Sequence, residues 1–158
     1  MKLALFDIDG VLANDQHRVQ HALDRKWPAY FDPKAMAADP VWEQGRSAVE
    51  DARAKGYTIG YMTGRRDDRR TLTEDWLAEN RFPFGRVIMR EFGEHEPLAN
   101  LKTKKIQKLV SQNQFSHVVL FDDDPEVIRL VHEQVGVDNA VHCTWHVKEK
   151  ALVKMATV

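Results

Sequence analysis

The sequence is poor in cysteine: among its 158 residues only Cys143 carries a thiol, so no disulfide bond can form within the chain. This favours a reducing compartment, and we expect the protein in the cytoplasm. Long hydrophobic runs are also missing, and the amino terminus becomes charged too early for a signal peptide, so we expect no membrane partner. The formal net charge of −1 at pH 7 gives no global attraction to nucleic acid, so binding to a polyanion would need a local basic patch.

What is present is typical of a globular protein, with 43% hydrophobic and 30% charged residues and no repeat, low-complexity tract or linker. We therefore predict a single domain over residues 1–158. Short apolar runs alternate with helical patterns along the chain. This alternation predicts an α/β fold, with a Rossmann-like sheet of five parallel strands flanked by helices.

The strands are expected at 2–6, 58–62, 86–89, 118–121 and 140–144. Asp39 is expected to cap a helix that begins at Pro40 and ends at Gly56. Further helices are expected at 67–80, 101–112 and 125–135, with a short one at the carboxyl terminus. Ligands bind such sheets outside the carboxyl ends of the strands, so polar residues at those ends are the candidates for chemistry.

The first strand ends in two carboxylates, Asp7 and Asp9, followed directly by Gly10. One carboxylate can attack phosphorus as a nucleophile, and a second can donate a proton to the leaving oxygen and later accept one from water. Glycine permits a sharp turn close to a ligand. Taken alone, this pair could equally be two solvated acids in a turn.

The second strand ends in Thr63, Gly64 and Arg65. A hydroxyl group and backbone N–H groups at the end of a strand can cradle a phosphate. The alternative is that Thr63 only caps the next helix.

The fourth strand is followed by three consecutive acids, Asp122, Asp123 and Asp124. Their mutual repulsion favours a bound cation, and carboxylate oxygens are the ligands that Mg²⁺ prefers. We predict Asp122 and Asp123 as ligands, and we predict that Asp124 caps the helix that starts at Pro125. The acids after the first and fourth strands should then converge on one ion.

A lysine cluster precedes the fourth strand, and one of its members could neutralise a bound phosphoryl group. We favour Lys102 because it lies at the expected helix start, although Lys104 or Lys105 could take this role. At least two of the three are expected to be ordinary surface charges.

The order of these signals is strand–DxDG, strand–TGR, lysine, strand–DD, and it resembles the four motifs of the haloacid dehalogenase superfamily over residues 2–144. The resemblance implies a phosphatase with that fold and a small cap. It implies that Asp7 is the nucleophile and Asp9 the general acid/base. It also implies that Thr63 binds the phosphate and that Lys102 stabilises it. It also implies Mg²⁺ held by Asp7, the backbone carbonyl of Asp9, Asp122 and Asp123. We expect neighbouring acids to raise the pKa of Asp9, which would keep it protonated for the departing alcohol.

Within the superfamily, the chain is most similar to the phosphatase domain of bacteriophage polynucleotide kinase and its stand-alone relatives. The common features include Asp-Gly-Val-Leu-Ala, His17-Arg18, Gly56-Tyr57 and Met89-Arg90. A phosphate-binding loop of the kinase type is missing from the sequence, so we expect phosphatase activity only. The similarity implies a magnesium-dependent phosphomonoesterase that forms an aspartyl phosphate and acts on nucleic-acid 3′-phosphate ends or nucleotides. Its substrate contacts would come from Gly64, Arg65 and Arg90.

Residues 14–39 occupy the place where this superfamily carries a cap. The segment is short, so we expect it to cover the site only in part and to leave room for a bulky substrate. Its aromatic side chains, Trp27, Tyr30 and Phe31, could stack on a base. Packing of the segment onto the body of the protein is the alternative use of these rings.

Two other functions compete with this interpretation. A phosphatase of small metabolites would keep the same motifs with a different substrate. A receiver domain of bacterial signalling also combines Asp, Thr, Lys and Mg²⁺ on a parallel sheet, but its acid pair follows the first strand and its phosphate acceptor comes later. The order here is reversed, and Asp9 supplies an acid for hydrolysis.

Overall fold

The computed structural model describes residues 1–145. The strands are β1 (Lys2–Phe6), β2 (Tyr57–Arg66), β3 (Val87–Arg90), β4 (His117–Asp122) and β5 (Ala140–His142). The α-helices are α1 (Val19–Leu23), α2 (Trp27–Tyr30), α3 (Pro33–Ala37), α4 (Glu43–Ala54), α5 (Arg70–Glu79), α6 (Leu98–Ser111) and α7 (Pro125–Gln134). Three short 3-10 helices are η1 (Gln16–Arg18), η2 (Asp67–Arg69) and η3 (Val137–Asn139). The short helix expected at the carboxyl terminus lies outside the described residues.

The five strands form one parallel sheet in the order β3-β2-β1-β4-β5. This confirms the expected α/β fold class. The winding direction reverses at β1, because β2 and β3 follow on one side and β4 and β5 on the other. Phe6, the last residue of β1, is level with Tyr61 of β2 and Phe121 of β4. The residues after β1 therefore lie at the topological switch point, where ligands bind in sheets of this type.

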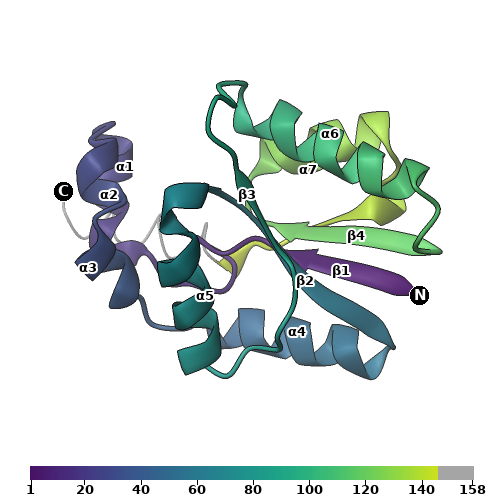
Figure 1. Ribbon diagram of the computed structural model, residues 1–158, viewed down its shortest axis with the longest axis horizontal. Coiled ribbons are helices and arrows are strands. Elements are labelled where there is room, and N and C mark those ends of the chain that lie inside the picture. The colour runs from purple at the N-terminus through teal and green to yellow at the C-terminus, as the bar shows by residue number, and fades with distance from the viewer. Residues whose placement is uncertain (146–158) are drawn as a thin grey trace.

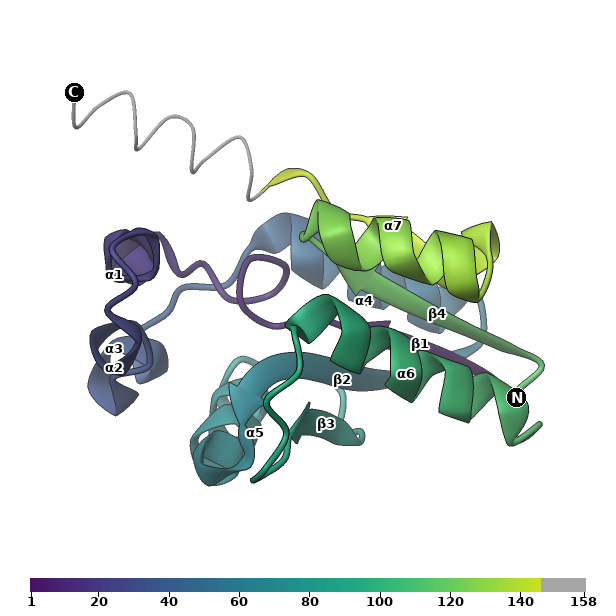
Figure 2. The same cartoon turned by 90° about the horizontal axis from the view of Figure 1, so that it is seen from above.

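Alternate residues of β1 feed two hydrophobic cores. Leu3 and Leu5 pack with α6 and α7, whereas Ala4 and Phe6 pack with α4 and α5. Figure 1 shows the two pairs of helices on opposite faces of the sheet, and Figure 2 shows α6 and α7 side by side. A strand buried on both faces is apolar throughout, which explains why the short apolar runs predicted the strands well.

β3 forms one edge of the sheet, and its outward carbonyl groups accept hydrogen bonds from side chains. The guanidinium of Arg70 donates to the Val87 carbonyl at 2.9 Å, and the ammonium of Lys105 donates to the Met89 carbonyl at 2.8 Å. Charged side chains along an edge strand oppose pairing with another chain.

The helix expected from Pro40 begins later, because Asp39 is used elsewhere. α4 starts at Glu43, and the Asp39 carboxylate accepts hydrogen bonds from Arg18 instead of capping a helix. Its carboxyl end agrees with the prediction, since Gly56 adopts a φ of 84° just beyond α4.

Two further boundaries differ and both affect the site. α6 begins at Leu98 rather than 101, directly after Pro97, which takes the N-cap position. β2 continues past Met62 to Arg66 with an irregular register, so Thr63 lies in extended chain rather than in a turn. The predicted cap of α7 is confirmed, because the Asp124 side chain accepts from the N–H of residue 126 at 2.9 Å.

The 14–39 segment carries η1 and α1 to α3 and lies beyond the carboxyl ends of the strands, at the left of Figure 1. α3 has the signature of a capped helix: the Asp32 side chain accepts from the Ala35 N–H at 3.1 Å, and Pro33 is the first helical residue. None of the helices described within residues 1–145 is both long enough and apolar enough to cross a membrane.

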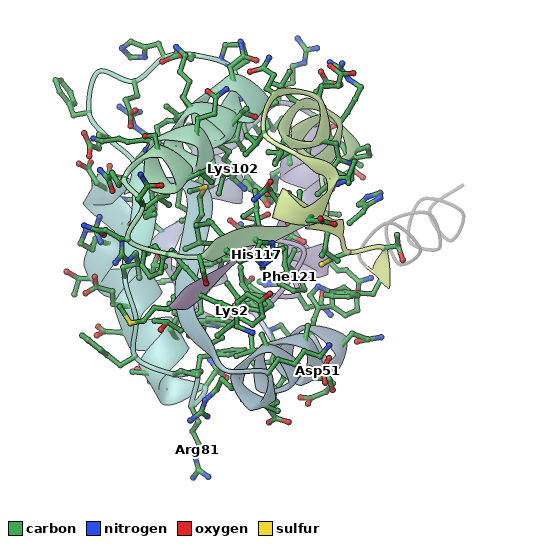
Figure 3. The ribbon with its side chains drawn as sticks, turned by 90° about the vertical axis from the view of Figure 1, so that its right-hand side faces the viewer. Lys2, Asp51, Arg81, Lys102, His117 and Phe121 are labelled. Atoms are coloured by element: carbon green, nitrogen blue, oxygen red, sulfur yellow. The ribbon has the colours of Figure 1, made fainter. Side chains whose placement is uncertain are left out.

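Figure 3 looks onto the opposite end of the sheet, where the strands begin. Lys2 donates to the carbonyl of Lys55 at 2.8 Å. His117 lies 2.7 Å from both the Tyr57 hydroxyl and the Asp138 carbonyl. Since a carbonyl only accepts, His117 Nε2 donates to Asp138. These contacts join β2 to β4, and β1 to the end of α4, at the end remote from the acids.

Cys143 follows β5 and is 1% exposed. Burial, helped by the nearby acids led by Asp122, raises the pKa of its thiol, so the reactive thiolate is scarce. We expect a thiol-specific disulfide reagent to label the native protein on the order of 100-fold more slowly than the urea-unfolded protein. Absorbance of the released chromophore measures both rates, and equal rates would contradict the buried position.

Candidate active site

Three carboxylates meet where β1 and β4 end. Asp7 directly follows β1, Asp122 is the last residue of β4, and Asp123 comes next. One carboxylate oxygen of each lies within 4.8 Å of the other two. Asp7 and Asp122 are buried, and Asp123 is partly buried. The structure therefore brings together the acids that were predicted to converge. Gly10, with a φ of 91°, provides the turn that follows β1.

The charges of these acids oppose one another. Burial raises the pKa of Asp7 well above its usual range, and the Asp122 carboxylate raises it further, while Lys102 acts in the opposite direction. A hard divalent cation between the oxygens would offset this repulsion, and a set of carboxylate donors is what Mg²⁺ prefers. The donor chemistry of Asp7, Asp122 and Asp123 therefore fits such an ion.

Lys102 is the internal cation of the site. Its Nζ lies 3.1 Å from Asp7 Oδ1 and 2.5 Å from Asp122 Oδ2, and the residue is only 2% exposed. Burial alone would lower the pKa of this lysine, but Asp122 and then Asp7 outweigh it, so the pKa is raised. Because α6 starts at Leu98, Lys102 lies in its second turn rather than at its first residue.

The other two lysines of the cluster point elsewhere. Lys104 binds Glu96 at 2.5 Å, and Lys105 binds Glu94 at 3.1 Å in addition to the edge of β3. Of the three candidates, Lys102 is the one placed among the acids. Its role in catalysis stays a prediction.

The Asp9 side chain is held by two arginines instead of joining the three acids. Its Oδ1 accepts from Arg18 at 2.5 Å and from Arg65 at 2.8 Å, and its Oδ2 accepts from Arg65 Nε at 3.0 Å. Burial would raise the pKa of Asp9, but Arg65 and then Arg18 outweigh it and hold the pKa well below its usual range. The expected upward shift is therefore wrong, because the sequence did not indicate that two buried guanidinium groups would face this carboxylate.

A buried ion network links Asp9 to the 14–39 segment. Arg18 also donates to Asp39 Oδ1 at 2.9 Å and Oδ2 at 2.6 Å, and to the Tyr30 carbonyl at 2.9 Å. His17 lies 2.6 Å from Asp39 Oδ1. The arginine is 1% exposed. Sequence reasoning noted His17-Arg18 only as part of a resemblance and took Asp39 for a cap, so it missed this network.

Replacing Asp39 with Asn should destabilise the protein. The change leaves the buried Arg18 short of a counter-charge, and breaking a buried pair costs about 3 kcal/mol. Urea unfolding followed by circular dichroism measures the loss in the free energy of unfolding. The matched control is Asp51→Asn on α4, whose side chain is 70% exposed, with an expected change below about 0.5 kcal/mol. Equal stability of the two variants would contradict a structural role for the network.

Thr63, Gly64 and Arg65 lie within β2 rather than after it, and their contacts are mostly internal. Thr63 Oγ1 accepts from the backbone N–H of Arg65 at 3.1 Å. The alternative that Thr63 caps the next helix is wrong, because Arg66 takes the N-cap position of η2. The third guanidinium nitrogen of Arg65 donates to Thr73 at 3.1 Å, so all three nitrogens are engaged within the protein. A Cβ on Gly64 would lie 2.7 Å from the end of the Leu98 side chain, which would have to shift to accommodate it. Substrate contacts of these residues stay predictions.

A cavity of about 720 Å³ opens over the acids. Its lining combines the site residues with the 14–39 segment and comprises Asp7, Asp9, Asp15, Ala22, Trp27, Tyr30, Phe31, Gly64, Arg65, Arg90, Leu98, Lys102, Asp122, Asp123, Asp124 and Pro125. Arg90 borders the cavity while its Nη1 holds the carbonyls of Glu94 and Glu96 at 3.0 and 2.9 Å. The loop between β3 and α6 is thereby fixed beside the opening.

Sequence comparison identifies a matching family and a curated relative. The family described as "PITM 1-3, LNS2 domain" matches residues 4–140. Membrane-associated phosphatidylinositol transfer protein 1 of Homo sapiens is 28% identical over 118 residues, which is 74% of this chain and 9% of that protein. The chain therefore corresponds to a small part of the curated relative that it matches.

Solved structures share the fold at low sequence identity. A chain of the Pnkp1/Rnl/Hen1 RNA repair complex aligns with a TM-score of 0.72 and 18% identity, over 90% of this chain and 42% of that one. Class C acid phosphatase from Bacillus anthracis aligns with a TM-score of 0.58 and 14% identity, over 100% of this chain and 80% of that one. At this level of identity the likeness establishes the fold.

Proposed function

The chain belongs to the family described as "PITM 1-3, LNS2 domain", and from this premise we propose that it is a magnesium-dependent phosphomonoesterase that works through an aspartyl phosphate. The family and the structural neighbours together point to a phosphatase with a fold of the haloacid dehalogenase type. The observation that supports magnesium dependence and an aspartyl phosphate is that Asp7, Asp122 and Asp123 lie together, with Lys102 between two of them.

In the first step, an Asp7 oxygen forms a bond to phosphorus, and the bond from phosphorus to the ester oxygen breaks. The products are a mixed anhydride on Asp7 and an alkoxide that must receive a proton. Lys102 stabilises the charge on the transferring phosphoryl group, because its ammonium already lies 3.1 Å from Asp7. Mg²⁺ held by Asp7, Asp122 and Asp123 would supply further positive charge to the phosphoryl oxygens.

In the second step, water attacks the phosphorus of the anhydride and regenerates the Asp7 carboxylate and inorganic phosphate. A base must remove a proton from that water, and we assign this to Asp9, whose carboxylate Arg65 and Arg18 keep ionised although the same two arginines weaken it as a base. In the first step Asp9 would have to carry a proton, which the two arginines oppose. A phosphate dianion placed beside Asp9 favours the protonated form and competes for the guanidinium groups.

For the substrate, we propose nucleic-acid phosphate ends or nucleotides. The cavity is bordered by Arg90 and is larger than a phosphate group needs. The structural neighbour from an RNA repair complex supports this class by fold only. A small phosphorylated metabolite remains the alternative, because the acids and Lys102 would treat its phosphate in the same way.

A phosphate-release screen tests the proposal. The substrates are 3′- and 5′-phosphorylated oligonucleotides, nucleoside monophosphates, sugar phosphates, and vesicles with a phosphorylated lipid, since the curated relative is named for membranes and phosphatidylinositol. Each is assayed with Mg²⁺ and with a chelator. We expect turnover of nucleotide substrates with Mg²⁺ only. Turnover of sugar phosphates or lipid alone would reject the substrate class, and no release from any ester would reject the phosphatase proposal.

A further inference from the structure

The cavity above the acids has one aromatic wall. Trp27 and Phe31 come from α2 and the residue after it, and both border the same cavity as Asp7 and Lys102. Their ring centroids lie 6.2 Å apart with an interplanar angle of 27°, so the two rings form a stacked pair. Trp27 is 50% exposed, which is unusual for so large an apolar side chain.

Tyr30, the third aromatic residue of this wall, has a structural role. Its hydroxyl donates to Asp15, and the Arg18 guanidinium lies 4.5 Å from its ring centroid. The residue is 8% exposed. Tyr30 thus fixes α2 to the network around Asp9. Because α2 is fixed, the wall formed by Trp27 and Phe31 is held in place. Of the two uses considered for these aromatics, packing therefore falls to Tyr30.

The size of the cavity leaves space between the wall and the acids. Its volume of about 720 Å³ lies within the range of roughly 300–1,000 Å³ that holds drug-sized ligands, and a phosphate group fills only a small part. A substrate that fills the rest must present a flat apolar group to the indole while its phosphate reaches Asp7. A nucleobase joined through a sugar to a phosphate has this form, whereas a sugar phosphate offers no aromatic face.

We propose that Trp27 is a specificity-determining residue that stacks on the nucleobase next to the phosphate removed at Asp7. This inference rests on the proposed phosphatase function and narrows its substrate class. Stacking of this kind accepts every base, because each base has a π-face. The aromatic wall therefore selects for the presence of a base and not for its identity.

The test uses a 3′-phosphorylated hexathymidylate and the same strand with an abasic residue at its 3′ end. For wild type, we expect KM to be about tenfold lower with the base than without it, which corresponds to about 1.4 kcal/mol. Trp27→Ala should raise KM for the base-bearing strand about tenfold, with kcat unchanged, and leave the abasic strand unaffected. Trp27→Phe should retain most of the preference because it keeps an aromatic face.

The matched control is Leu23→Ala, an apolar residue on α1 that is 54% exposed, and it should leave both values of KM unchanged. Equal KM changes on the two strands in Trp27→Ala would overturn the stacking role, and so would equal KM values in wild type. Neither result would affect the phosphatase proposal. Lack of phosphate release from both strands and from every ester of the screen would instead reject that proposal.

Discussion

Replacing Asp7 with Asn should lower the rate of phosphate release by about 10³-fold or more, because the side chain is the proposed nucleophile and an amide does not form the anhydride. Asn has nearly the same volume, so the fold should persist. The loss of one buried negative charge near Asp122 should leave the thermal midpoint unchanged or higher, since burial and the Asp122 charge both oppose an ionised Asp7. Phosphate release under saturating substrate and a thermal scan measure the two effects.

The control for this variant is Asp51→Asn, which makes the same chemical change on the exposed face of α4. It should retain wild-type turnover. A second readout is covalent: wild type quenched during turnover of a radiolabelled substrate should carry label that hydroxylamine removes, and Asp7→Asn should carry none. Turnover by Asp7→Asn equal to that of the control would remove Asp7 from the mechanism.

Lys102→Met is expected to have the second-largest effect, a loss of about 10²–10³-fold in kcat. Methionine keeps the length of the side chain but leaves Asp7 and Asp122 without their internal cation. Breaking this buried arrangement should also cost about 3 kcal/mol of stability without added metal. Turnover assays and urea unfolding in the presence of a chelator measure the two losses.

Added Mg²⁺ should restore more stability to Lys102→Met than to wild type, because the cation then compensates the unpaired carboxylates. Lys104→Met is the matched control, since Lys104 lies two residues along α6 and binds Glu96 on the surface. It should change turnover by less than about twofold. If both lysine variants lost activity equally, the placement of Lys102 between the acids would not explain its function.

The strands and the acids at their ends could be predicted from the sequence because the signals are local. A parallel strand buried on both faces is a continuous apolar run, and a carboxylate directly after such a run must lie at the carboxyl edge of the sheet. Asp7, Asp122 and Asp123 were located in this way, and the structure brings their oxygens together. The position of Lys102 within its helix was not predicted correctly. α6 starts at Leu98, directly after Pro97, which is three residues earlier than expected.

The ion network could not be predicted because its partners are far apart in the sequence. Asp32-Pro33 and Asp39-Pro40 have the same local signature of a helix start, yet only the first begins a helix. The second is distinguished by a long-range partner, Arg18, which binds the Asp39 carboxylate. The same kind of contact reversed the expected pKa shift of Asp9, since the guanidinium of Arg65 comes from the end of β2, 56 residues along the chain.

The attachment of the 14–39 segment through Arg18 also has a kinetic consequence. Swinging this segment away from the sheet would break the bond of the buried Arg18 guanidinium to Asp9, at a cost of about 3 kcal/mol, whereas its bonds to Asp39 lie within the segment. Entry and exit of ligands should therefore proceed through the existing cavity entrance, without a motion of this segment that limits the turnover rate. An entrance of this kind can accept the tip of a long polymer whose remaining length stays in solvent.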